Sequence, residues 1–266
     1  MRLTAVLAAN GGAGKVRGVA ARLAAVLTAL LVTISLAANP AAAQPDTEPD
    51  ITPMIVGGEL QTDADGLAAV LINGNYNCSG SIVDNYWVLT ARHCIEDANG
   101  NRHPNTAISV RVKSIYWNSG GGVVQVATSR VRTSHDIAML KLNRSANAQP
   151  VRLPSATTTV GATTYAFGWG RTCSGCNPST TLRRATQDVL AINGYVDYFG
   201  GRAIRTNGLN GNACFGDSGG PLFKLVDGLR YQVGVLSTIS SGCTGLAYWA
   251  TVPDSRDWIL DVMATV

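Results

Sequence analysis

Gly216-Asp217-Ser218-Gly219-Gly220-Pro221 is the stretch of this 266-residue chain that decides its fold and its chemistry. Glycines on both sides of Ser218 let the backbone turn sharply and let a substrate carbonyl approach the serine hydroxyl. The amides of Gly216 and Ser218 can then stabilise an oxyanion, as acyl transfer to a serine requires. The same pattern occurs in ordinary glycine-rich turns, so a catalytic serine also needs a base elsewhere in the sequence.

The histidines narrow the choice of base. The chain has three, and all of them precede Ser218: His93, His103 and His135. An α/β-hydrolase needs its base histidine after the serine, so that class is excluded. His93 follows the apolar run Trp87–Thr90, whereas His103 lies in a polar segment. We therefore take His93 as the candidate base.

An acidic partner for His93 is found at Asp136, which precedes the apolar run 137–140. We expect Asp136 to open a strand there. Neighbouring strand residues point to opposite faces, so His135 and Asp136 are not expected to serve one site. A carboxylate buried beside His93 would hold the tautomer of the ring and stabilise its imidazolium. Subtilisin-type hydrolases use the order Asp, His, Ser. Asp84 could take the first place in that order, but the helices of that fold are not predicted.

Short apolar or alternating runs recur from Ile55 onward, separated by clusters of Gly, Asn, Ser and Pro. This pattern predicts many short strands in an all-β barrel or sandwich. The runs that we single out are Ala68–Ile72, Trp87–Thr90, Ile108–Val112, Val123–Ala127, Ala138–Leu142, Tyr165–Phe167 and Gln232–Leu236. Near the C-terminus we predict a helix, capped by Asp254 or Ser255, with an apolar face made of Trp258, Ile259, Val262 and Met263.

The first 54 residues have a different composition. Residues 1–43 are predicted to be a signal peptide, because Arg17 and Arg22 precede an apolar run, 23–38, that ends near small residues. That run is shorter than the ~20 residues of a membrane-spanning helix. Residues 44–54 contain three prolines and three acidic residues and almost nothing apolar to bury, which predicts an exposed activation propeptide. Six cysteines, an even number, fit an exported and oxidised protein.

The charge balance excludes several classes of partner. Residues 55–266 hold 17 basic and 14 acidic side chains, a net charge of +3, and the basic residues are scattered. This charge is too small to favour nucleic acid or an anionic membrane. We therefore expect no nucleic-acid partner and no stable membrane association. No constellation of metal ligands stands out, and residues 105–122 contain no Asp or Glu for calcium.

Taken together, these residues resemble the chymotrypsin/trypsin family of serine peptidases. The resemblance covers residues 55–266, and it implies a single trypsin-like peptidase domain there. The implied fold class is all-β, with two packed six-stranded antiparallel β-barrels and a C-terminal α-helix. The implied activity is that of a serine endopeptidase that forms an acyl-enzyme. The blocks that carry the resemblance are Ile55–Gly58, Cys78–Ser81, Trp87–Cys94, His135–Ala138, Gly168–Gly170, Gly216–Pro221 and the terminal helix.

The resemblance also implies roles for individual residues. His93 would be the base, Asp136 its orienting partner and Ser218 the nucleophile. The amides of Gly216 and Ser218 would form the oxyanion hole. Cleavage before Ile55 would free an amine that pairs with Asp217. Met54 precedes that bond in place of the usual Arg or Lys, so we expect an activating protease that prefers a large apolar residue after the cut.

Two of the disulfides that we expect follow the family pattern, Cys78–Cys94 and Cys214–Cys243. Cys173 and Cys176 match no disulfide of the family. A Cys-x-x-Cys pair can be redox-active or half of a zinc site. No second ligand pair accompanies it, so we expect a small local disulfide, no metal and no cofactor.

The resemblance further implies a substrate pocket. Ser237 would pair with the substrate backbone. Asn212 would lie at the pocket floor without a charge, and Ile239 and Ala247 would form its walls. We therefore expect a shallow, elastase-like pocket that takes small or medium apolar residues. The enzyme is expected to be a secreted, extracellular monomer of bacterial origin that acts on protein or peptide substrates. The alternative is a catalytically silent binding protein, which retention of all three triad residues disfavours.

Overall fold

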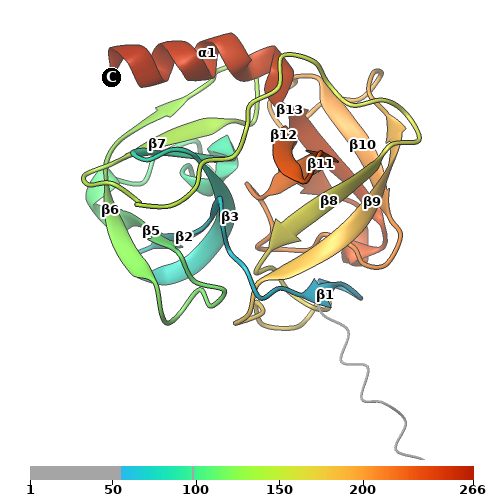
Figure 1. The fold of residues 1–266 in the computed structure, drawn as a ribbon, viewed down its shortest axis with the longest axis horizontal. Coiled ribbons are helices and arrows are strands. Elements are labelled where there is room, and N and C mark those ends of the chain that lie inside the picture. The colour runs from blue at the N-terminus through green and yellow to red at the C-terminus, as the bar shows by residue number, and fades with distance from the viewer. Residues whose placement is uncertain (1–54, 98) are drawn as a thin grey trace, which may run out of the picture. The chain divides into compact units, whose positions relative to one another are not determined.

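The computed structural model describes residues 55–97 and 99–266. The predicted signal peptide, 1–43, and the predicted activation propeptide, 44–54, lie outside this described part. Within it, the fold is mostly β-strand with one long helix at the C-terminus (Figure 1).

The first barrel is a closed ring of six antiparallel strands in the order β2-β3-β4-β7-β6-β5 (Figure 1). Its strands carry apolar residues that fill the interior, and β4 is buried along its whole length. The predicted runs 87–90, 108–112 and 138–142 coincide with β4, β5 and β7. The bounds are β2 (Leu67–Ile72), β3 (Asn75–Asp84), β4 (Trp87–Thr90), β5 (Ile108–Val112), β6 (Gly122–Val131) and β7 (Ala138–Leu142).

The second barrel follows in the chain and has the strand order β9-β10-β13-β12-β11-β8. Pairing of β8 with β9 closes the ring. Strand β1 (Glu59–Leu60) pairs with the start of β9 and extends its edge. The expected fold class, two six-stranded antiparallel barrels with a C-terminal helix, is therefore confirmed. The bounds are β8 (Thr163–Gly168), β9 (Arg183–Ala191), β10 (Ala203–Gly208), β11 (Pro221–Val226), β12 (Leu229–Ile239) and β13 (Leu246–Thr251).

The C-terminal helix α1 (Val252–Thr265) follows β13 and packs on the first barrel (Figure 1). Its buried Ile259 and Val262 belong to the same core cluster as the residues inside that barrel. The predicted cap at Asp254 or Ser255 was wrong, because the helix begins earlier, with Thr251 as its N-cap residue. Pro253 explains the early start, since the first turn of a helix does not use the N–H that proline lacks.

All six cysteines lie in the described part of the chain and are paired. The disulfides are Cys78–Cys94, Cys173–Cys176 and Cys214–Cys243, the pairs that we expected. Cys78–Cys94 ties β3 to the 3₁₀ turn η1 (Arg92–Cys94). Cys214–Cys243 ties the segment before Ser218 to the turn η3 (Ser241–Cys243). A third turn, η2 (Asn105–Ala107), precedes β5.

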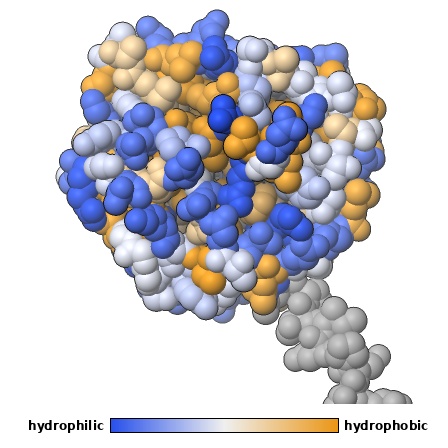
Figure 2. Space-filling model, viewed as in Figure 1, coloured by the Kyte–Doolittle hydropathy of each residue, from blue (hydrophilic) through white to orange (hydrophobic). Residues whose placement is uncertain are grey.

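The face of the molecule seen in Figure 2 is largely hydrophilic, with hydrophobic residues in several separate groups. Across residues 55–97 and 99–266, no helix has both the length and the apolar character needed to cross a membrane.

Candidate active site

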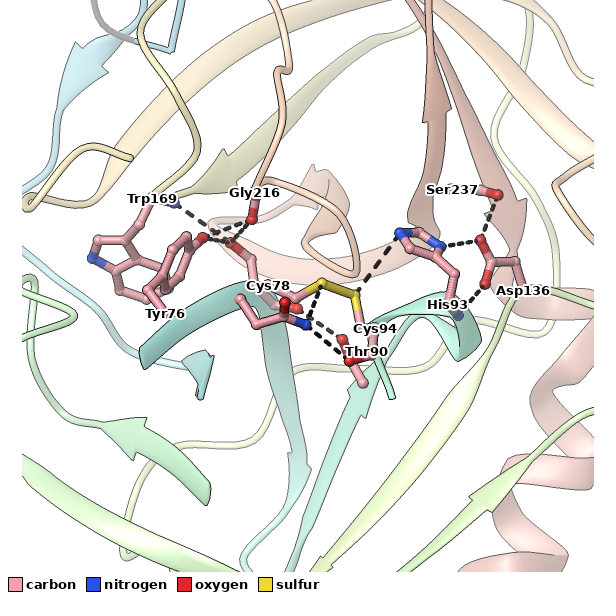
Figure 3. Close-up of a disulfide and its surroundings, with 11 residues drawn as sticks. Tyr76, Cys78, Thr90, His93, Cys94, Asp136, Trp169, Gly216 and Ser237 are labelled. Atoms are coloured by element: carbon pink, nitrogen blue, oxygen red, sulfur yellow. Dashed lines mark hydrogen bonds and ion pairs between the residues drawn. A yellow bond between two sulfur atoms is a disulfide. The ribbon is translucent and has the colours of Figure 1, made fainter. Parts of the chain in front are cut away.

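His93 and Asp136 meet because the strands next to them pair. Strand β4 runs antiparallel to β7, with Thr90 opposite Ala138. The turn after β4 and the segment before β7 are therefore neighbours. His93 Nδ1 lies 2.7 Å from Asp136 Oδ2, and the backbone N–H of His93 donates to Asp136 Oδ1 at 3.0 Å (Figure 3). The expectation that Asp136 opens the strand was wrong, because β7 begins only at Ala138.

The carboxylate of Asp136 is completely buried. The hydroxyl of Ser237 donates to Asp136 Oδ2 at 2.6 Å (Figure 3). Burial alone would raise the pKa of Asp136, but the hydrogen bond and charge of His93, together with the Ser237 hydroxyl, outweigh it and lower that pKa below its usual value. Asp136 is therefore ionised at neutral pH despite its burial.

The Cys78–Cys94 disulfide fixes the residue that follows His93. Asn77 Nδ2 donates to the carbonyl of Cys94 at 2.9 Å, and His93 Nε2 lies 4.0 Å from Cys94 Sγ (Figure 3). Cys78, His93 and Cys94 are the one group of potential metal ligands found close together among the described residues. Both sulfurs are joined in the disulfide, so they cannot act as thiolate ligands.

The Ser218 segment connects the two barrels. The carbonyl of Ser218 accepts from Ser79 N–H at 2.9 Å, and Gly219 N–H donates to Leu236 O at 2.9 Å. Gly219 cannot be larger, because a Cβ there would lie 2.1 Å from Thr90 Oγ1. Within the described residues, the amides of Gly216 and Ser218 donate no hydrogen bond, and none joins the Ser218 hydroxyl to His93. Both amides are therefore free to bind an acceptor.

Tyr76 restrains the carbonyl group of Gly216. Its hydroxyl donates to the carbonyl of Gly216 at 2.7 Å and lies 2.9 Å from Ser79 Oγ (Figure 3). The ring of Tyr76 packs against Trp169 and Trp117, with centroids 6.5 and 5.6 Å away. Gly216 has φ +96°, a conformation that favours glycine. The tyrosine therefore restrains the peptide between Gly216 and Asp217.

Asp217 lies beneath this loop and is 3% exposed. Its carboxylate accepts Gly170 N–H at 2.7 Å and Cys214 N–H at 2.9 Å. Burial raises the pKa of Asp217 to about 7, although these two amides act in the opposite direction. Burial, followed by the charge of Asp217, also raises the pKa of Tyr76 well above its usual value. No cation accompanies this carboxylate among the described residues.

The Ile55 segment pairs with the segment that precedes Ser218. Ile55 is 1% exposed, and Val56 forms an antiparallel bridge with Asn212, whose N–H donates to the Val56 carbonyl at 2.9 Å. Ile55 has φ +31°. A β-branched residue rarely adopts a positive φ, so the backbone is strained at this position.

A cleft of about 580 Å³ brings His93 and Ser218 together with Ser237 and Ile239. Asn212 and Ala247 do not line it. Asn212 is half-buried and pairs with Val56, and Ala247 is buried opposite Ile239 on the paired strand. The remaining lining residues are Arg92, Glu96, Asp97, Gly100, Tyr198, Phe199, Cys214, Phe215 and Thr238.

Sequence reasoning missed one wall of this cleft. Tyr198 and Phe199 come from the loop between β9 and β10, and the guanidinium of Arg92 lies 3.9 Å from the centre of the Phe199 ring. It also missed Tyr76, and the contact of Ser237 with Asp136. The sequence gives no signal for these contacts, because each joins segments that are distant in the chain.

The family model described as Trypsin matches residues 55–259. Trypsin alpha-4 of Lucilia cuprina is 31% identical over 215 residues, which are 73% of this chain and 80% of the relative. Trypsin epsilon of Drosophila erecta is 34% identical over 229 residues, 77% of this chain and 86% of the relative. These two relatives are insect proteins and lend no support to a bacterial source.

Solved structures show the same fold. Human heparin binding protein superposes with a TM-score of 0.67 at 23% identity, covering 79% of this chain and 97% of that protein. At this identity the likeness concerns the fold alone. The family match and the insect relatives show more: this chain belongs to the trypsin family of serine peptidases, whose members are serine endopeptidases.

Proposed function

We propose that this protein is a secreted serine endopeptidase that hydrolyses peptide bonds with Ser218, His93 and Asp136. The observation that carries the proposal is the 2.7 Å contact between His93 Nδ1 and the buried, ionised Asp136, at a cleft that Ser218 also lines. A buried carboxylate is costly unless it is paired, so this arrangement is favoured where an imidazolium forms during a reaction.

The proposed mechanism follows from the hydrogen bond that already occupies one ring nitrogen of His93. Asp136 holds Nδ1 of His93, so Nε2 is the ring nitrogen left to take the proton of the Ser218 hydroxyl. Ser218 Oγ attacks the scissile carbonyl carbon, and the resulting oxyanion binds the amides of Gly216 and Ser218. His93 gives its proton to the leaving amine as the C–N bond breaks. Water then hydrolyses the acyl-enzyme, with His93 as base, and the proton returns to Ser218.

Activation by cleavage before Ile55 is part of the proposal. The φ of Ile55 depends on the carbonyl that precedes it, so breaking the Met54–Ile55 bond would release the strain at +31°. The same cut would create an ammonium group at Ile55, which we propose as the partner of Asp217, since that buried carboxylate lacks a cation in the described residues. Both effects favour the paired Ile55 segment after cleavage, and an activating protease is therefore a required partner.

A preference for small or medium apolar residues before the scissile bond is also proposed. Ile239 lines the cleft next to Ser237, where a branched side chain would restrict large rings. Asn212, which the family resemblance places at the pocket floor, carries no charge to attract Arg or Lys, although it does not line the cleft in this structure. Pocket contacts of one methylene change binding by about 1–3 kcal/mol, so the preference is expected to be graded. The substrates would be proteins or peptides, and the enzyme would act as an extracellular monomer.

The experiment compares the activated protein with two matched serine variants on a peptide amide substrate. Ser218→Ala should lower kcat by roughly six orders of magnitude, as loss of a triad nucleophile does. Ser174→Ala, at an exposed serine in the Cys173–Cys176 loop, should leave kcat unchanged. An inactive parent protein would support the alternative of a catalytically silent binding protein. Appreciable activity in the Ser218→Ala protein would contradict the assignment of the nucleophile.

A further inference from the structure

Another buried carboxylate, that of Asp197, lies next to Asp136. Asp197 belongs to the loop between β9 and β10, is 4% exposed and accepts three backbone N–H groups. Its Oδ1 accepts from Phe199 at 2.9 Å and from Gly201 at 3.0 Å, which shapes its own loop. Its Oδ2 reaches a different segment and accepts the N–H of Asp136 at 3.0 Å. One side chain therefore fixes both the loop and the backbone of Asp136.

The neighbouring residue reaches Asp136 by a second route. The N–H of Tyr198 donates to Ser237 Oγ at 3.0 Å, and Ser237 Oγ lies 2.6 Å from Asp136 Oδ2. A backbone N–H can only donate, so the single hydroxyl proton of Ser237 is left to point at Asp136. Residues 197 and 198 thus hold the backbone and the side chain of Asp136 at the same time.

Charged and titratable side chains also lie around Asp197. Arg132 attracts it electrostatically, and His135 lies beside it, since a Cβ at Gly201 would be 2.6 Å from both Asp197 Oδ2 and a ring carbon of His135. Burial, followed by the charge of Arg132, lowers the pKa of His135, although Asp197 and Asp254 oppose this. His135 is therefore mostly neutral at pH 7. Among the described residues, the three amides are the groups that donate hydrogen bonds to the Asp197 carboxylate.

We propose that Asp197 is a positioning residue that fixes Asp136, so that its loop couples one wall of the substrate cleft to the His93–Asp136 pair. Tyr198, 66% exposed, and Phe199 form that wall. The ring of Tyr198 lies edge-on to His93, with centroids 6.3 Å apart. A substrate residue that contacts this wall therefore touches Tyr198 and Phe199. Their backbone N–H groups bind Ser237 and Asp197, the two residues that hold Asp136. The inference rests on the proposed peptidase function.

The test is Asp197→Asn in the activated full-length domain. The Asn carbonyl can still accept the amides of Phe199 and Gly201, but its NH₂ group faces the N–H of Asp136 and cannot accept it. We expect kcat to fall by about 10- to 100-fold, as for a small displacement of a catalytic group, with KM nearly unchanged. The acid limb of the kcat/KM profile should move to lower pH, because a displaced Asp136 stabilises the imidazolium less well.

Two matched variants distinguish a role of Asp197 in positioning Asp136 from an effect on the structure of its own loop. Asp84→Asn changes an exposed aspartate that makes the same kind of local turn, accepting the N–H of Tyr86 at 2.9 Å, and it should leave kcat unchanged. Tyr198→Ala keeps the N–H that binds Ser237 and removes only the ring, so it should raise KM and leave the acid limb in place. If Asp197→Asn fails to fold, Gly201→Ala takes its place, because its methyl group would press on Asp197 Oδ2.

A second readout does not depend on activity. The proton between His93 Nδ1 and Asp136 should give a far-downfield ¹H NMR resonance at low pH, because it lies in a short charge-assisted hydrogen bond. Asp197→Asn should move this resonance upfield or broaden it. An inactive parent protein would overturn the peptidase proposal but leave this comparison intact. An unchanged resonance with unchanged kcat, or an effect on KM alone, would overturn the role of Asp197.

Discussion

Asp217 provides the sharpest quantitative prediction, because its protonation should make the uncleaved protein sensitive to pH. The perturbation is cleavage before Ile55. We compare two forms that both carry Ser218→Ala to prevent self-digestion: one retains residues 44–54 and the other begins at Ile55. In the first form the nitrogen of Ile55 is part of a peptide bond, so within residues 55–97 and 99–266 Asp217 has two amide donors and no cation.

The magnitude follows from the pKa of Asp217. It is about 7 in the folded chain, whereas an unfolded aspartate titrates near 3.8. Between these values the folded state holds one more proton than the unfolded state, so unfolding releases a proton and raising the pH destabilises the fold. The contribution of protonated Asp217 to the free energy of unfolding is fully present below pH ~4 and is lost as the pH rises through about 7. The total loss is on the order of 4 kcal/mol, less if water reaches the carboxylate.

The assay is urea unfolding followed by tryptophan fluorescence between pH 4 and pH 8.5. The uncleaved form should lose stability as the pH rises to about 7 and then level off. In the form that begins at Ile55, the ammonium pairs with ionised Asp217, so stability should persist to pH ~8 and fall only as the amine loses its proton. Asp217→Asn should remove the pH dependence from the uncleaved form. It should also lower the free energy of unfolding by an amount that does not depend on pH, because the Asn NH₂ group would face a backbone N–H donor. Identical profiles in the two cleavage forms, or an unchanged slope in Asp217→Asn, would refute the reasoning.

Two further predictions concern the cleft. Tyr76→Phe removes the hydroxyl that holds the Gly216 carbonyl at 2.7 Å. It should lower kcat by about 5-fold without a matching change in KM, because one neutral hydrogen bond contributes about 1 ± 0.5 kcal/mol. Steady-state kinetics on a peptide amide measure this, and an effect on KM alone would contradict it. Ile239→Gly should raise cleavage after Phe or Leu relative to Ala, measured with a peptide library; a parent enzyme that already cuts best after Arg, Lys or Phe would show that the pocket is not shallow.

Part of this fold could be predicted from local sequence. Strands β4, β5 and β7 are runs of apolar residues, and their bounds match the prediction. Strands β3 and β10 were not singled out, because Asn, Ser, Gly and Arg interrupt them and their pairing with neighbouring strands supplies the stabilisation. The start of α1 was also missed, since Pro253 reads as a helix breaker unless it lies in the first turn.

The candidate site likewise contains some contacts that could be predicted from the sequence and others that could not. The pairing of His93 with Asp136 follows from chain order and from the strands beside them. Asp197 gives no such signal, because its contact with Asp136 spans 61 residues and depends on the path of a loop. Tyr76 contacts Gly216 across 140 residues. Contacts of this kind come from tertiary packing, which a periodicity in the sequence cannot encode.

The most direct test of the central claim is covalent labelling of the activated protein with a phosphonofluoridate, followed by mass spectrometry of its peptides. The reagent reacts with a serine whose proton has a base to accept it and whose oxyanion has donors. We predict one phosphonyl group per chain, on Ser218, with loss of peptidase activity in proportion to labelling and no adduct in the Ser218→Ala protein. Labelling at another residue, or full peptidase activity after Ser218 is modified, would contradict the account.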